Sequence, residues 1–217
     1  SNRDAMVYIA SNDGMLHAID ASTSGGNERF AYIPSVLISK LSTLKTDPYV
    51  HNYFVDGRMD VRSFSIGGSN KTILAGALGS GGKGLFALNV TDAAVTSETN
   101  AASKILWEIT NSTTGFTNLG YTYGLPVLAT LPSGTPALIV GNGYNNTGNG
   151  HASLFLINAD TGALIAEIDT GSGTIASPNG LSSPSLVDIN IDGKADYAYA
   201  GDIDGNLWKF DLSTNTA

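Results

Sequence analysis

A short acidic run near the C-terminus has the residue types and the spacing of a metal-binding loop. Residues 188 to 196 read D-x-N-x-D-G-x-x-D, with oxygen-bearing side chains at the first, third, fifth and ninth positions. Calcium loops of the EF-hand type carry side-chain oxygens at positions one, three and five, glycine at six and a backbone carbonyl ligand at seven. We therefore predict a calcium site formed by the side chains of Asp188, Asn190, Asp192 and Asp196 and by the backbone carbonyl of Lys194.

Electrostatics favours a cation in this loop. Three carboxylates held within a few ångströms repel one another, at roughly 1 kcal/mol or more per pair at intermediate dielectric, and a divalent ion offsets that cost. Calcium fits better than magnesium because several protein oxygens in a flexible ring suit calcium, whereas magnesium prefers a rigid octahedral shell with retained water. The alternative is a solvated Asp/Asn/Gly turn. Whether the calcium would be a structural clamp or a regulatory switch stays open.

The loop is predicted to lie between β-strands. Position twelve holds Tyr199 instead of the bidentate glutamate of helix–loop–helix sensors, and the residues around it read as a strand. This strand belongs to the last of four repeated segments. Each segment has an apolar strand, a turn with Gly or Asn, and a second strand closed by Asp or Asn, and the equivalent leucines are Leu16, Leu85, Leu154 and Leu207.

Two of the repeats are completed to sets of four strand-like runs by the residues around them. The runs cover residues 61–66, 72–77, 84–89 and 105–109, and then 125–131, 136–141, 153–158 and 163–168. Four-stranded antiparallel units repeated along a chain are typical of a β-propeller. We therefore predict an all-β, β-propeller-like fold with about four blade units, forming a whole or a partial propeller.

The predicted units form a single domain or fragment over residues 1–217, and they cover approximately residues 5–35, 59–110, 119–171 and 180–214. The first unit begins at its second strand and the last stops after its third. This pattern predicts either an excerpt of a longer chain or a blade completed across the termini. One short helical insertion is expected near residues 34–45, because Leu37, Leu41 and Leu44 follow helical spacing after Pro34.

Composition excludes several classes of protein. The 217 residues carry 11 Lys+Arg against 19 Asp+Glu, a formal net charge of −8, so nucleic acid and anionic membranes are unsuitable partners. The 26 glycines and only 14% charged residues exclude mainly helical folds. The chain has no cysteine, which removes disulfides and thiolate chemistry. No apolar run approaches the ~20 residues of a membrane-spanning helix, so membrane insertion of this fragment is not expected.

Other polar motifs are better explained by structure than by chemistry. Residues 79–84 match G-x-G-x-x-G, but a strand follows where a dinucleotide site needs a helix, so a Gly-rich hairpin is predicted. Asp13-Gly14 and Asp204-Gly205 are read as hairpin turns. His17 occupies the repeat position held elsewhere by Phe86, Phe155 and Trp208, which predicts a packing role. No motif identifies a catalytic nucleophile, and we do not expect an enzyme.

Several runs together resemble the C-terminal β-propeller domain of the PilY/PilC family, the type IV pilus-associated biogenesis factors and adhesins of Gram-negative bacteria. The matching runs are Ser11–Ala18 (SNDGMLHA), Phe30–Ser35 (FAYIPS), Tyr53–Gly57 (YFVDG), Gly141–Asn145 (GNGYN), Gly180–Pro184 (GLSSP) and Asp196–Asp202 (DYAYAGD). In that family a D-x-D-x-D-G-x-x-D loop binds calcium, and calcium occupancy is linked to the balance of pilus extension and retraction. The resemblance carries this role over to Asp188, Asn190, Asp192 and Asp196, with Asn190 as the one departure.

The same resemblance implies the setting in which the chain acts. It implies a place at the bacterial cell surface, associated with the pilus, in the outer membrane or outside the cell. The implied partners are pilins and minor pilins, together with host or abiotic surfaces, and the implied processes are fimbrial biogenesis, adhesion and twitching motility. Some family members carry an Arg-Gly-Asp motif for integrins. Here Asp56-Gly-Arg58 has the reverse order, so integrin binding is not inferred.

Two rival functions remain open. The repeat ending Asp-Gly-x-Leu-aromatic-x-apolar-Asp also resembles the blades of quinoprotein (PQQ-type) dehydrogenases, which would make the protein an enzyme. Against this, the vicinal cysteine pair of many such enzymes is absent, and neither Trp107 nor Trp208 has an evident cofactor setting. The second rival is a calcium-stapled propeller of the integrin-like kind that serves only as a protein-binding scaffold, unrelated to pili.

Overall fold

Four antiparallel β-sheets make up the fold in the computed structural model, which describes residues 3–217. The first sheet contains β1 (Met6–Ala10), β2 (Leu16–Asp20) and β3 (Glu28–Tyr32), and the second β4 (Met59–Ile66), β5 (Ser69–Ala77), β6 (Gly84–Asn89) and β7 (Ile105–Thr110). The third contains β8 (Val127–Thr130), β9 (Pro136–Gly141), β10 (His151–Asn158) and β11 (Leu164–Gly173), and the fourth β12 (Ser185–Val187), β13 (Tyr197–Gly201) and β14 (Leu207–Asp211).

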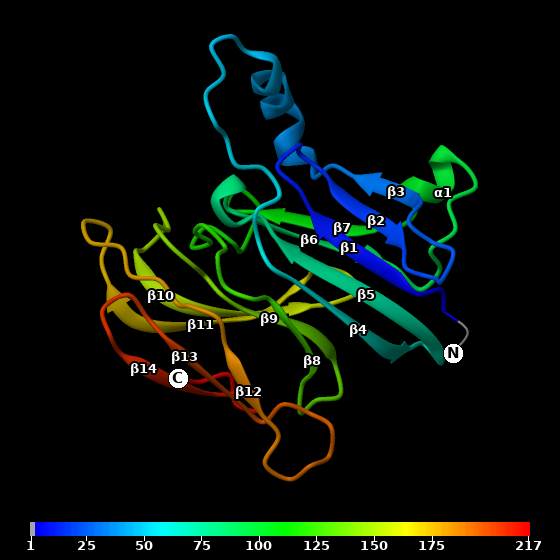
Figure 1. The fold of residues 1–217 in the computed structure, drawn as a ribbon. Coiled ribbons are helices and arrows are strands. Elements are labelled where there is room, and N and C mark those ends of the chain that lie inside the picture. The colour runs from blue at the N-terminus through cyan, green and yellow to red at the C-terminus, as the bar shows by residue number, and fades with distance from the viewer. Residues whose placement is uncertain (1–2) are drawn as a thin grey trace.

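Within each sheet, strands that follow one another in the chain are neighbours, which is the meander of a propeller blade. The sheets stand side by side and fan out from one region, as Figure 1 shows. Leu16 in β2 occupies the place of Leu85 in β6 and Leu154 in β10. The first sheet therefore holds the second to fourth strands of a unit, and the fourth sheet holds the first to third. The all-β propeller-like prediction is confirmed.

Three apolar cores lie between successive sheets. The core between the second and third sheets contains Ile73, Leu85, Leu138 and Phe155, each at most 2% exposed. Equivalent cores join the first sheet to the second around Phe86 and the third sheet to the fourth. The middle sheets are consequently covered on both faces, so β5 and β10 read as nearly continuous apolar runs rather than alternating ones. Full burial of each large apolar side chain contributes about 1.5–3 kcal/mol.

Tight turns join the strands where the sequence carries Asp-Gly and Gly-rich segments. Gly14 and Gly205 have φ of +101° and +89°, which is the left-handed conformation that glycine adopts without steric cost. The Gly-rich stretch from residue 79 makes one turn of 3-10 helix, Gly79–Gly81, and leads directly into strand β6. The hairpin predicted there in place of a dinucleotide-binding turn is confirmed.

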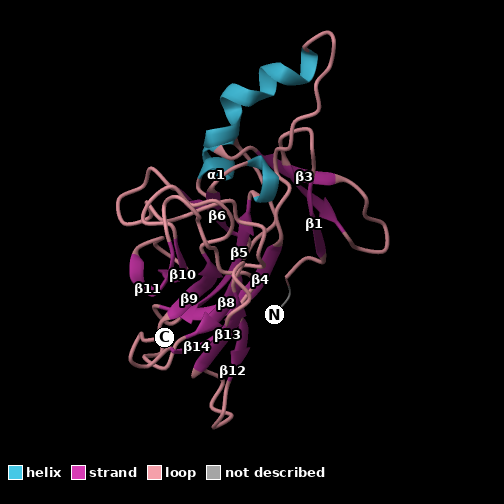
Figure 2. Cartoon of the chain, turned by 90° about the vertical axis from the view of Figure 1, so that its left-hand side faces the viewer, coloured by secondary structure: helices cyan, strands magenta, loops and turns pink. Residues whose placement is uncertain are grey.

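The predicted helical insertion is present as a 3-10 helix, Ser35–Lys45, that begins after Pro34. Figure 2 shows it projecting from the sheets with the loop that follows it, and Leu37 is its one fully buried side chain. A second helix, α1 (Glu98–Ala102), was not predicted because its five residues carry no apolar periodicity; Ser97 caps it by accepting a hydrogen bond from the Asn100 backbone N–H. Among the described residues no helix has the length and apolar character needed to cross a membrane.

The predicted packing role of His17 is wrong. Its ring is hydrogen-bonded on both sides, at 2.6 Å from Nδ1 to Glu28 and at 2.9 Å from Nε2 to Asp13, and it lies partly exposed. The hydrogen bond with Glu28 raises the pKa of His17, since the carboxylates favour the charged imidazolium. Phe86 and Phe155 occupy the equivalent position on sheets that a preceding sheet covers. The outward face of the first sheet is open in this structure, as the half-exposed Val7 and Ile9 also show.

Candidate functional site

The predicted metal loop connects β12 to β13 at one end of the fourth sheet (Figure 1). The strand pair is in register up to the loop, with Val187 opposite Tyr197, and the Asp196 backbone N–H donates to the Val187 carbonyl at 2.9 Å. The backbone N–H of Ala195 donates to the Thr130 carbonyl of the third sheet, also at 2.9 Å. The loop therefore has a fixed base that is tied to the neighbouring sheet.

The middle of the loop is exposed, including its two isoleucines. Ile189 and Ile191, at the second and fourth positions, are 70% and 89% exposed. The chain turns sharply at Ile191 and Gly193, where φ is +60° and +84°. A positive φ is unusual for a β-branched residue and costs on the order of 1–3 kcal/mol. The loop therefore holds a conformation that the preference of isoleucine does not explain.

All four predicted side-chain ligands accept hydrogen bonds from the loop backbone, and the two at its ends are half-buried. The Asp188 carboxylate accepts from the backbone N–H of Asp192 at 3.1 Å and from that of Gly193 at 2.8 Å. The Asp196 carboxylate reaches back to the N–H of Ile189 at 2.8 Å. These bonds cross the loop from its two ends, so the half-buried Asp188 and Asp196 brace it internally.

The other ligand side chains are exposed. Asn190 accepts from the Asp192 N–H at 3.0 Å through its side-chain oxygen. Asp192 accepts from the Lys194 backbone N–H at 2.9 Å and lies 3.2 Å from the Lys194 ammonium. The backbone hydrogen bond, aided by that ammonium, holds the pKa of Asp192 below its ordinary value, so this carboxylate is ionised at neutral pH. The Lys194 ammonium therefore already pairs with the carboxylate at the fifth position of the loop.

The structure places all five predicted residues on one loop, but it does not gather their carboxylates around a point. Across residues 3–217, no three His, Cys, Asp or Glu side chains are placed so that they could hold one metal ion. The donor set nevertheless fits calcium in its chemistry. It consists only of oxygens, with three carboxylates, one amide and one backbone carbonyl, and hard oxygen ligands in a flexible loop are what calcium takes. Binding would require Asp192 to leave Lys194.

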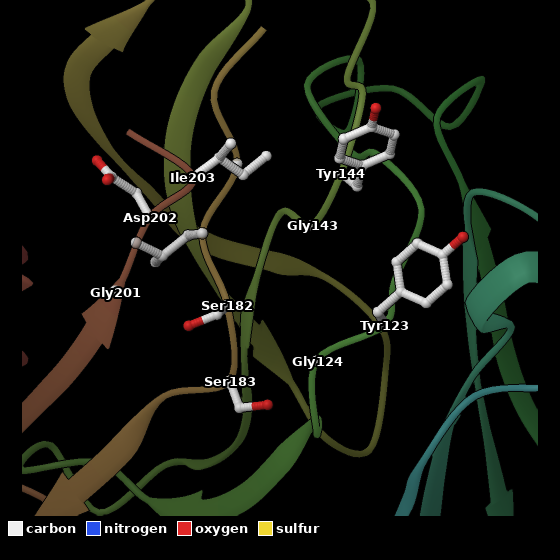
Figure 3. Close-up of a pocket in the computed structure, with 11 residues that line it drawn as sticks. Tyr123, Gly124, Gly143, Tyr144, Ser182, Ser183, Gly201, Asp202 and Ile203 are labelled. Carbon is white, nitrogen blue, oxygen red and sulfur yellow. The ribbon is translucent and has the colours of Figure 1, made fainter. Parts of the chain in front are cut away.

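A second candidate site is a cavity of about 360 Å³ at the opposite end of the same hairpin, shown in Figure 3. Four segments line it: residues 123–124 before β8, 143–144 after β9, 180–183 before β12, and 201–203 at the end of β13. The sequence does not predict this cavity, because its residues come from segments up to 80 positions apart. The one feature of the sequence that points to this region is the Gly-containing turn repeated at the end of each unit's second strand.

The carboxylate beside this cavity, Asp202, is held by hydrogen bonds from its own fold. Asp202 accepts hydrogen bonds from Trp208 Nε1 at 2.8 Å and from the side-chain amides of Asn179 and Asn206 at 2.9 Å each. Partial burial disfavours its charge, but these hydrogen bonds outweigh that effect and hold the pKa of Asp202 at about 2. With its oxygens engaged by the neighbouring turn, Asp202 is a structural group and not a free acid for catalysis.

The sequence of this chain matches one protein family over its whole length. The sequence profile of the family described as the PilY1 beta-propeller domain matches residues 1–217. The type IV pilus biogenesis factor PilY1 of Pseudomonas aeruginosa strain PAO1 is 46% identical over 213 residues, which are 97% of this chain and 17% of that protein. A PilY1 homolog of Xylella fastidiosa strain Temecula1 is 40% identical over 215 residues, 95% of this chain and 14% of that one. The chain thus spans about a sixth of the length of these relatives.

A solved structure of the same family also resembles this chain in its fold. The crystal structure of the Pseudomonas aeruginosa PilY1 C-terminal domain superposes with a TM-score of 0.78 at 44% identity, covering 97% of this chain and 39% of that one. A quinohemoprotein alcohol dehydrogenase of Pseudomonas putida HK5 gives a TM-score of 0.50 at 18% identity, covering 97% of this chain and 32% of that chain. At that identity the second likeness concerns the fold alone and gives no support to a dehydrogenase activity.

Proposed function

This chain belongs to the PilY1 β-propeller family, and from that premise we propose that it is a non-enzymatic, calcium-binding module of a type IV pilus-associated protein. Its relatives are named as pilus biogenesis factors. In this proposal it acts in pilus biogenesis, in the balance of extension and retraction that drives twitching, and in surface adhesion. It works at the cell surface, with pilins and minor pilins as partners and host or abiotic surfaces as contacts.

The observation that carries the calcium part of the proposal is the braced loop between β12 and β13. Its backbone is held in a sharp turn at Ile191 and Gly193, and its oxygen-bearing residues stand at the spacing of a calcium loop. Asp188, Asn190, Asp192, Asp196 and the carbonyl of Lys194 would hold the ion. Bound calcium would supply the positive charge that three carboxylates on one loop lack.

The chain's own residues would pass the effect of binding to the fold. Asp188 and Asp196 already clamp the two ends of the loop through backbone N–H groups. Ala195 joins the loop to Thr130 of the third sheet, and Leu212 N–H donates to the Asp196 carbonyl at 3.0 Å. A loop stiffened by calcium would therefore fix the junction of two sheets. An empty loop would leave that junction to these hydrogen bonds alone.

The pilus role is tested in bacteria that carry the substitution in the full-length parent protein. We expect Asp192→Ala to change surface piliation and twitching, because it removes the fifth-position ligand while leaving the fold intact. Asp204→Ala is the matched control: it removes one exposed carboxylate from a hairpin turn of the same sheet. Piliation and twitching unchanged in Asp192→Ala, at equal protein level, would reject the regulatory role and favour a scaffold unrelated to pili.

Lys194 gives a prediction with the opposite sign. Its ammonium lies 3.2 Å from the Asp192 carboxylate, so it competes with an incoming cation, whereas the proposed ligand of this residue is its backbone carbonyl. We expect Lys194→Met to tighten calcium binding severalfold, because the substitution removes a positive charge beside a ligand carboxylate. Calorimetric titration of both proteins at low ionic strength measures the change. Weaker binding in Lys194→Met would show that the lysine side chain supports the site instead.

A further inference from the structure

The cavity in Figure 3 has walls of exposed aromatic side chains that the fold does not need for packing. Tyr123 and Tyr144 are 51% and 54% exposed, and both rings stand beside the hollow. Ile203, on the other side, is 52% exposed. Large rings left in solvent at the rim of a cavity provide contact surface at little entropic cost, which is the usual feature of a binding site and not of a core.

These rings sit on a rigid frame. Tyr121 and Tyr144 exchange two backbone hydrogen bonds, at 2.7 and 3.0 Å, and so join the segment before β8 to the turn after β9. The two segments approach so closely that a Cβ on Gly143 would lie 2.1 Å from the Tyr121 carbonyl oxygen. Ser183 accepts a hydrogen bond from the Leu125 backbone N–H at 2.8 Å, which fixes the third segment. The cavity is therefore preformed.

The polar groups of the cavity lining are neutral apart from one carboxylate. The hydroxyl groups of Tyr123, Tyr144 and Ser182 have no hydrogen-bond partner among residues 3–217, so they are available to a ligand as donors and acceptors. The one carboxylate on the wall, Asp202, accepts hydrogen bonds from the side chains of Trp208, Asn179 and Asn206, and it keeps its negative charge. No lining side chain carries a positive charge with which to recognise an anionic ligand.

Gly201 leaves open space on the wall of the cavity. It lies in strand β13, where glycine weakens pairing. Gly143 and Gly180 on the same wall are required because a Cβ would collide with backbone, but a Cβ on Gly201 would meet nothing nearer than 3.8 Å. It would enter open space beside the Ser182 hydroxyl, 3.9 Å away. Alanine at this position would therefore narrow the cavity without colliding with the chain.

We propose that this cavity binds a neutral saccharide. The two tyrosine rings offer flat apolar faces against which the C–H face of a sugar ring packs, and the free hydroxyls match the hydroxyl groups at its edge. A volume of about 360 Å³ suits one or two sugar rings. The negative charge of Asp202 and the lack of a lysine or arginine on the wall disfavour acidic sugars. The site lies at the opposite end of the β12–β13 hairpin from the calcium loop, so sugar binding does not depend on calcium.

The test is an NMR titration of the isotopically labelled full chain with methyl glycosides of glucose, galactose, mannose and N-acetylglucosamine, in calcium and again in EDTA. We expect at least one glycoside to shift resonances of residues 123–124, 143–144 and 180–183 at millimolar concentration in both buffers. Tyr123→Ala and Tyr144→Ala should each weaken binding about tenfold or more, the loss of about one stacking contact. Tyr49→Ala removes an equally exposed tyrosine from the projecting insertion and should change nothing.

Gly201→Ala keeps the proposal testable if a tyrosine variant fails to fold. A methyl group fits there without a clash, so the melting temperature should be unchanged or higher, while binding falls several-fold as the cavity narrows. The proposal is overturned if no glycoside shifts these resonances, or if Gly201→Ala and both tyrosine variants bind like the parent. It is equally overturned if a proline-rich peptide or glucuronate occupies the cavity and the neutral glycosides do not.

Discussion

Replacing Asn142 with alanine is expected to lower the free energy of unfolding by about 3–5 kcal/mol, although the residue belongs to neither candidate site. Its side chain is fully buried and makes four hydrogen bonds. The amide nitrogen donates to the carbonyls of Asn118 and His151 at 3.1 and 2.8 Å, and the oxygen accepts from the backbone N–H groups of Ser153 and Leu181 at 3.1 and 3.0 Å. Alanine would leave buried donors unpaired, at about 1–3 kcal/mol each.

The bond to Leu181 explains why the effect reaches beyond one sheet. Asn142 follows β9 in the third sheet, whereas Leu181 lies in the segment that leads into β12 of the fourth. Asn12 does the same between the first two sheets, since its side-chain oxygen accepts from the Phe54 backbone N–H at 3.0 Å. Urea unfolding followed by tryptophan fluorescence measures the loss. Asn70→Ala, at an exposed position near the start of β5, is the control, and a loss below about 1 kcal/mol in Asn142→Ala would show that the hydrogen bonds of Asn142 do not hold the two sheets together.

Replacing Phe155 with alanine is expected to cost a similar amount, about 3–5 kcal/mol, by a different mechanism. Phe155 is 0% exposed in β10, and its ring centre lies 5.4 Å from that of Phe116 in the core between the second and third sheets. The substitution opens a cavity where the rigid meanders cannot collapse, and it removes the contact between the two rings.

Phe155→Leu separates cavity formation from loss of the aromatic pair. Leucine restores most of the apolar volume, so its cost should stay below about 2 kcal/mol. The same urea experiment applies, with buried Trp107, on the neighbouring β7, as the reporter. Equal losses in Phe155→Ala and Phe155→Leu would show that packing volume between the sheets does not determine stability.

The strand pattern could be predicted because it is local. Apolar runs such as 72–77 and 153–158 are bounded by glycine turns, and both become strands of middle sheets. The hairpin at residues 79–84 could be predicted because the residues after it read as a strand. The role of His17 could not be predicted from its repeat position, because burial at that position depends on whether another sheet covers it. Helix α1 was missed because five residues give no periodicity.

The two candidate sites also differ in how far the sequence predicts them. The calcium loop lies within nine consecutive residues, so spacing alone is sufficient to propose it; its ligand oxygens, however, are turned toward the loop backbone and Lys194, which no spacing foretells. The cavity draws Tyr123 and Tyr144 from the third repeat and Ser182 and Gly201 from the fourth. Only the packing of two units brings these residues together, so no single sequence motif indicates the cavity.

Thermal melts of the parent chain and of Asp192→Ala, each in calcium and in EDTA, show whether the loop at residues 188 to 196 binds calcium. Calcium should stabilise the parent by RT ln(1 + [Ca]/Kd), about 2.7 kcal/mol at a hundredfold excess over Kd, which raises the melting temperature of a chain of this size by about 5–10 °C. Asp192→Ala should melt like the calcium-free parent in both buffers. A single melting temperature, shared by parent and variant and independent of calcium, would contradict the claim.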